Sequence, residues 1–183
     1  MGQFLRRGHR CIVLLLAASG TAGDGESEAG FREAFQTRAG LAGTPIVAHH
    51  DGTPESIRQR LGGLLGLNPA PTAFLVARSM PSLMTASELM RRGLRVPGDA
   101  AVIARDSDHF LEYFSPRLAR YQADPEGYAR RLVRLVIKLA RGAGPGPRGL
   151  RIMPDFMPGE SLENIRRAAR TRGADVAENA TGR

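Results

Sequence analysis

The chain has 183 residues, a mass of 19.7 kDa and a formal net charge of +8. This length accommodates one domain with a substantial core, and a composition of 42% hydrophobic and 24% charged residues excludes the disordered and fibrous classes. No apolar run approaches the roughly 20 residues that span a bilayer, which excludes a transmembrane protein.

Cysteine and arginine usage narrow the class further. Cys11 is the single cysteine, so an internal disulfide and a cysteine-based zinc site are excluded, and a reducing cytoplasm is the expected location. The basic charge suggests nucleic acid as a partner. However, Lys138 is the single lysine among 26 basic residues and tryptophan is absent. This indicates a high-GC genome rather than a surface that binds phosphates and stacks on bases.

The N-terminal region has two interpretations. Arg6, Arg7 and Arg10, followed by the apolar residues 11–18, are typical of the charged and apolar regions of a signal peptide. A strand that is buried on both faces of a sheet has the same continuous apolar pattern.

Strand and helix signals then alternate, which predicts an α/β protein with a parallel sheet and helices on both of its faces. The predicted strands cover residues 11–18, 45–49, 72–77 and 100–105. The predicted helices cover residues 26–39, 54–67 and 81–92. Thr53 and Ser79 are the expected N-caps of the second and third helices, and Gly40 and Gly93 are expected to end the first and third.

The second half of the sequence predicts one long helix and little other regular secondary structure. Asp124 and Pro125 begin a helix that runs to Arg141, with an apolar stripe opposite a basic face. Such a stripe is expected to self-associate or to repack on the sheet. A loop is predicted at 142–147 and short strands at 150–153 and 156–157. We therefore expect one domain over 1–162 and a polar C-terminal helix or disordered tail over 163–183.

Three groups of segments, in this order, resemble the effector-binding domain of the LacI/GalR family of bacterial transcription regulators. They are GHRCIVLL (8–15) with GFREA (30–34); PTAFLVA (71–77) with GLRVPGD (93–99) and VIARD (102–106); and SPRL (115–118) with PGES (158–161). Together they cover nearly all of residues 5–162.

The resemblance implies one lobe of a periplasmic-binding-protein-like type I fold that senses a sugar or related effector, forms a homodimer, and needs no cofactor or membrane. The family's helix-turn-helix and first lobe do not appear in this sequence. The chain is therefore expected to be a truncated gene product, the result of a start codon assigned too late, or a degenerate paralogue, and to contact DNA only through a domain absent from it. In full-length relatives, the apolar side of the long helix belongs with the first lobe. The alternative is a secreted substrate-binding protein of the same fold that serves sugar transport.

Asp106 is the first candidate effector-binding residue. It follows the strand predicted at 100–105, and ligands of open α/β sheets bind outside the carboxyl ends of the strands. A carboxylate at this edge accepts hydrogen bonds from hydroxyl groups, and the matching family residue contacts the effector. The alternative is that Asp106 caps a turn at Ser107 and Asp108.

The other candidates are positions where this sequence departs from the family. Arg78 and Ser79 replace a usual Asn-Asp pair, and Arg78, which only donates hydrogen bonds, favours a sugar acid or phosphosugar; the alternative is a solvated arginine beside a helix cap. Ser27 stands where the family has an effector-clamping arginine. Asp51 lies where the family often has an aromatic residue. These losses argue against an ordinary hexose as the effector.

Two histidine-containing segments, His49-His50-Asp51 and residues 106–109, hold side chains that bind metals or act as bases. No metal-binding, phosphate-loop or nucleophile motif accompanies them. We therefore predict neither a metal site nor enzymatic activity, and we expect His9 to be a structural residue of the Gly-His-Arg turn.

Overall fold

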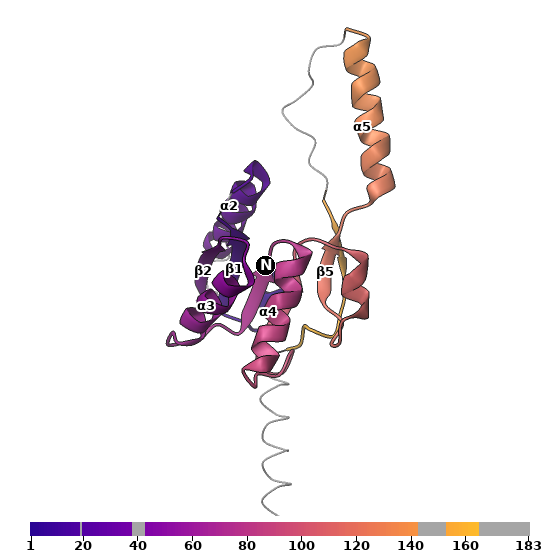
Figure 1. Cartoon of the computed structure of the whole chain (residues 1–183). Coiled ribbons are helices and arrows are strands. Elements are labelled where there is room, and N and C mark those ends of the chain that lie inside the picture. The colour runs from indigo at the N-terminus through magenta and orange to yellow at the C-terminus, as the bar shows by residue number, and fades with distance from the viewer. Residues whose placement is uncertain (19, 38–42, 143–152, 165–183) are drawn as a thin grey trace, which may run out of the picture.

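The computed structural model describes residues 1–18, 20–37, 43–142 and 153–164, and these form one six-stranded sheet in the order β2-β1-β3-β4-β5-β6 (Figure 1). The strands are β1 (Cys11–Ala17), β2 (Thr44–His50), β3 (Ala73–Val76), β4 (Ala101–Ala104), β5 (Ala119–Gln122) and β6 (Asp155–Met157). The first five pair in parallel, and β6 runs antiparallel to β5. The predicted α/β class with a mostly parallel sheet is confirmed.

Helices cover both faces of this sheet. The helices of the chain are α1 (Gly2–Arg6), α2 (Ala22–Gln36), α3 (Pro54–Leu65), α4 (Ser79–Arg91), α5 (Pro125–Ala140) and a 3-10 turn, η1 (His109–Tyr113), and α1 to α4 are the ones that pack on the sheet. One apolar core lies between the sheet and α3 and α4, and a second lies between the sheet and α1 and α2. Neighbouring residues of β1 enter opposite cores: Leu15 the first and Leu14 the second. The buried-strand interpretation of the N-terminal apolar run is therefore confirmed.

Local capping explains where two of the helices begin. The Thr53 hydroxyl accepts a hydrogen bond from the Ser56 backbone N–H at 3.2 Å, which confirms the predicted start of α3. α2 begins at Ala22, four residues before the predicted start, because Asp24 accepts a hydrogen bond from the Thr21 backbone N–H at 3.3 Å. Glycines at positions 23 and 25 hide this first turn from a pattern search, because glycine is a weak helix former.

The predicted cap of α4 is wrong. Ser79 is the first residue of the helix, and Arg78 occupies the cap position. The Ser79 hydroxyl is buried and has no hydrogen-bond partner within the described part of the chain.

The second half contains elements that the sequence did not reveal. η1 and β5 were not predicted, nor was α1 near the N-terminus. β5 lacks an apolar run because Arg120 lies in it, buried and paired with Glu112 at 2.6 Å. By contrast, β6 confirms the strand predicted at 156–157, and Asp124 caps α5 as expected by accepting a hydrogen bond from the Glu126 backbone N–H. The end of the first predicted helix, most of the predicted loop and strand at 142–153, and nearly all of the tail lie outside the described residues.

α5 projects from the body of the domain (Figure 1), and none of its residues is buried. Its large apolar side chains are exposed: Tyr128, Leu132, Val133, Leu135, Val136, Ile137 and Leu139. The helix therefore does not repack on its own sheet. Among the described residues, no helix is long and apolar enough to cross a membrane.

Candidate ligand site

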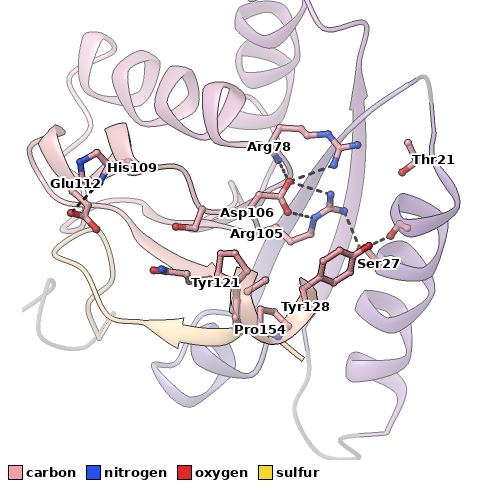
Figure 2. Close-up of a pocket in the computed structure, with 15 residues that line it drawn as sticks. Thr21, Ser27, Arg78, Arg105, Asp106, His109, Glu112, Tyr121, Tyr128 and Pro154 are labelled. Atoms are coloured by element: carbon pink, nitrogen blue, oxygen red, sulfur yellow. Dashed lines mark hydrogen bonds and ion pairs between the residues drawn. The ribbon is translucent and has the colours of Figure 1, made fainter. Parts of the chain in front are cut away.

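A cavity of about 840 Å³ lies at the carboxyl ends of β3 and β4, bordered by the first turns of α2 and α5 (Figure 2). This is the edge at which ligands of open α/β sheets bind, and β1 and β3 flank the point where the strand order reverses. The volume falls within the range of small-molecule sites. The cavity is therefore the candidate ligand site of the chain.

Arg78 and Asp106 meet at this edge, as the sequence predicts. The Arg78 backbone N–H donates to Asp106 Oδ2 at 3.0 Å, and Arg78 Nη1 lies 3.4 Å from the same oxygen. Asp106 therefore binds the loop that follows β3 instead of capping the turn at Ser107, which had been the alternative.

The backbone of Arg78 has a φ of 70°, the single positive φ among the non-glycine residues described. A non-glycine residue in a sparsely populated conformation costs on the order of 1–3 kcal/mol and persists only where its surroundings hold it. Here the Asp106 carboxylate holds the Arg78 N–H, and the side chain of Arg78 is directed into the cavity region (Figure 2). Such strain often marks a functional position.

Arg105 and Asp24 complete the cluster, and no sequence motif marks either of them as a site residue. Arg105 follows β4, and its Nε and Nη2 lie 3.1 and 3.4 Å from the two oxygens of Asp106. Its Nη1 donates to Asp24 Oδ1 at 2.7 Å and to the Ser27 hydroxyl at 3.0 Å, and both of these residues are on α2. Asp24 Oδ2 also accepts from Arg78 Nη2 at 3.2 Å. Two carboxylates thus hold two guanidinium groups.

The pKa shifts in this cluster follow from its ion pairs. Burial by itself raises the pKa of Asp24, but hydrogen bonds from Arg105 and Thr21 outweigh it and hold the pKa below its usual value. Burial likewise lowers the pKa of Arg105, and the contacts with Asp106 and Asp24 reverse that effect and raise it. Asp24 and Arg105 are therefore both charged at neutral pH.

The opposite wall of the cavity comes from η1, β5 and α5. Glu112 lines it and is held by the buried Arg120, which also donates to the Ser107 hydroxyl at 3.0 Å. Tyr121 presents an aromatic ring and packs against Phe156, with ring centroids 5.3 Å apart. This wall offers an acceptor and an aromatic surface to a ligand.

The structure brings three of the five predicted site residues to the cavity. Ser27 lines it beside Arg78 and Asp106, and the Ser27 hydroxyl donates to the Gly23 carbonyl at 2.7 Å. Ser79 does not line the cavity, because the start of α4 buries its side chain. Asp51 does not line it either: its Oδ1 accepts from the Thr53 backbone N–H at 2.8 Å, next to the start of α3.

The histidines have separate local roles. His9 contacts the Thr72 hydroxyl at 3.0 Å and the Glu163 carbonyl at 3.1 Å, which agrees with a structural role. His49 lies 3.7 Å from Glu28, whereas His50 is buried and its Nδ1 accepts from the Gly52 backbone N–H. In the described part of the chain, no three histidine, cysteine, aspartate or glutamate side chains are grouped so as to hold a metal ion.

The fold and the cavity define an open α/β domain of the kind that binds a small molecule at the carboxyl edge of its sheet. The profile of a family described as "Periplasmic binding protein-like domain" matches residues 1–162. The chain belongs to this family.

Its relatives with assigned functions are transcription regulators. The HTH-type transcriptional regulator CelR of Thermobifida fusca is 25% identical over 159 residues, which is 87% of this chain and 47% of CelR. The HTH-type transcriptional repressor PurR of Mannheimia succiniciproducens is 26% identical over 112 residues, which is 61% of this chain and 34% of PurR.

Solved structures of LacI family regulators have the same fold. One from Bifidobacterium animalis subsp. lactis superposes with a TM-score of 0.78 at 21% identity, covering 88% of this chain and 58% of that one. Another regulator, from an Arthrobacter species and solved in complex with lactose, superposes with a TM-score of 0.70 at 25% identity, covering 88% of this chain and 60% of that one. The chain thus spans between 34% and 60% of the length of these relatives.

Proposed function

We propose that the chain is the effector-sensing part of a LacI-type transcription regulator of the cytoplasm, and that its effector is a small polyhydroxylated molecule. The observation that carries this proposal is the convergence of Asp106, Arg78 and Arg105 on one cavity at the carboxyl edge of the sheet. Guanidinium groups donate hydrogen bonds and carboxylates accept them, so together they match hydroxyl groups, which do both. The lactose in the Arthrobacter relative supports a ligand of this kind.

The cavity suits binding better than catalysis. The Ser27 hydroxyl is engaged by Arg105 and by a backbone carbonyl and therefore has no base to activate it. The names of the relatives describe them as HTH-type regulators. We therefore assign DNA contact to a helix-turn-helix, and not to the helices and strands described here.

We also assign homodimer formation to a groove of about 460 Å³ between α3 and α4. The buried Ile57, the partly buried Leu83 and the exposed Met80 give it an apolar floor, and the exposed Arg58 and Arg91 lie at its rim, with Arg91 paired to the buried Glu88. A second copy can therefore pack on this apolar floor, in the self-complementary manner of a two-fold dimer. Met80→Lys should shift the chain toward monomer in sedimentation, and an unchanged dimer would assign the interface elsewhere.

Thermal unfolding in the presence of sugars, sugar acids and hexose phosphates tests the effector proposal. A ligand at about 100 times its Kd stabilises the domain by about 2.7 kcal/mol. Asp106→Ala should abolish the shift, because it releases Arg78 and Arg105 from their positions. Arg32→Gln, on an exposed arginine paired with Glu28, is the matched control and should bind as the native chain does. A shift that survives Asp106→Ala unchanged would place the effector elsewhere.

A further inference from the structure

We propose that the cavity selects sugar acids over neutral sugars, that Arg78 and Arg105 bind the ligand carboxylate, and that Asp24 positions both of them. This inference rests on the proposed effector function and names the ligand class of that same site. The sequence pointed only to Arg78; the second guanidinium and its support come from the structure.

Asp24 is the centre of the cluster. Only 4% of its side chain is exposed, and it does not line the cavity. From behind the site it accepts hydrogen bonds from Arg105 Nη1, Arg78 Nη2 and the Thr21 hydroxyl. Two flexible side chains from different strand ends thus share one buried anchor, which fixes their guanidinium groups relative to each other. A pair fixed in advance loses less conformational entropy when it binds an anion.

Within the described residues, the hydrogen bonds already made leave three N–H groups of Arg78 and one of Arg105 unused. A guanidinium carries five N–H groups, and the side-chain contacts described for Arg78 use one on Nη1 and one on Nη2. The Arg78 side chain is 44% exposed, so its other N–H groups are open to a ligand. Asp106 Oδ2 already lies within 3.4 Å of three nitrogens of Arg78 and Arg105. Asp106 therefore serves mainly as a second anchor, and the ligand must supply acceptors.

A carboxylate fits these donors better than either alternative. One hydroxyl oxygen has two lone pairs, whereas a carboxylate accepts two parallel N–H···O bonds from an arginine. A phosphate dianion would bring two negative charges beside Asp106, in a cluster of two arginines and two aspartates whose charges already balance. A single negative charge on a polyol meets less repulsion there.

Titration calorimetry with matched probes tests this selectivity. D-Glucose, D-glucuronate and D-gluconate share a hexose skeleton and differ in whether they carry a carboxylate, and a hexose phosphate is the fourth probe. At least one of the two acids should bind at least tenfold more tightly than D-glucose, a difference of about 1.4 kcal/mol or more. Raising the salt concentration should weaken the acid more than the neutral sugar, because screening acts on the charged ligand.

Three variants then assign the residues. Arg78→Gln and Arg105→Gln should each reduce acid binding about tenfold or more and weaken D-glucose less, because the acid loses an ion pair where the neutral sugar loses one hydrogen bond. Asp24→Asn should reduce the acid-to-neutral affinity ratio although Asp24 does not line the cavity; a general loss of stability would not change that ratio. Arg32→Gln removes one exposed arginine and should leave the ratio unchanged. If Asp24→Asn does not fold, the two arginine variants alone decide the question.

Four results would overturn the inference. They are D-glucose binding as tightly as both acids, the hexose phosphate binding more tightly than either acid, both arginine variants weakening acid and sugar equally, and no acid binding up to about 10 mM. In the first three the effector proposal stands, with a different ligand class. The effector proposal itself fails only if no sugar, sugar acid or hexose phosphate produces a shift in thermal unfolding that depends on Asp106.

Discussion

Replacement of Glu88 by glutamine should remove a pH-dependent part of the stability of this domain. Glu88 is on α4 and only 3% of its side chain is exposed. Arg91 donates to both of its oxygens at 2.7 Å, and Arg92 Nε donates to Oε1 at 2.7 Å. Arg92 also donates to the Arg58 carbonyl at 3.1 Å and so connects α4 to α3. Glu88→Gln removes the charge that holds both arginines.

The pKa of Glu88 sets an upper limit on the effect. Hydrogen bonds from Arg91, and then from Arg92, overcome the penalty of burial and lower the pKa from 4.5 to about 2. At about 1.36 kcal/mol for each pKa unit, the limit is about 3 kcal/mol. Because 66% of the Arg91 side chain is exposed and therefore screened by water, we expect about 1–2 kcal/mol at neutral pH.

The sign of the pH dependence follows from the lowered pKa. The ionised form is favoured in the folded state, so the contribution is complete above pH 4.5 and is lost as the pH falls toward 2. Urea unfolding of the native chain and of Glu88→Gln, followed by circular dichroism between about pH 7 and pH 3, measures it. The stability difference between the two should shrink steadily as the pH falls.

Glu55→Gln provides the control for this experiment. Glu55 is 80% exposed and pairs with Arg58 at 2.9 Å, so its replacement should cost less than about 0.5 kcal/mol at every pH. A Glu88→Gln difference that stays constant across the pH range would show that packing, and not charge, accounts for the role of Glu88.

Three further predictions concern other parts of the molecule. Burial lowers the pKa of His9, so the domain should lose stability as the pH falls below 6.5, the ordinary pKa of histidine. Thermal melts of His9→Gln should show a weaker loss of stability than those of the native chain, and an equal loss would contradict this. Copies of the chain should also associate beyond the groove dimer through α5, more strongly at high salt because its basic face is then screened, and Leu132→Gln with Leu139→Gln should reduce this in sedimentation; a native chain that forms nothing larger than the dimer would contradict it. By fluorescence anisotropy, binding to DNA should be weak, non-specific and lost with salt; a specific complex that resists competitor at about 150 mM salt would refute this.

The sequence by itself determined those structural features that depend on residues close together in the chain. The continuous apolar run at 11–18 required a strand covered on both faces, and Thr53 with Pro54 required a helix start. The meeting of Arg78 and Asp106 followed as well, because parallel strands place their carboxyl ends at one edge of the sheet. Each of these inferences needs only the local spacing and a general rule of topology.

Only the tertiary structure decided which charged groups pair. Asp24 and Arg105 are 81 positions apart, and in the sequence each is one more ordinary charged residue. Their contact depends on how the first turn of α2 sits over the end of β4, a placement that periodicity does not specify. The same holds for Ser79, whose expected cap position is taken by Arg78. The site depends on side chains reaching across the sheet edge, and such long-range distances exist only once the strands have packed.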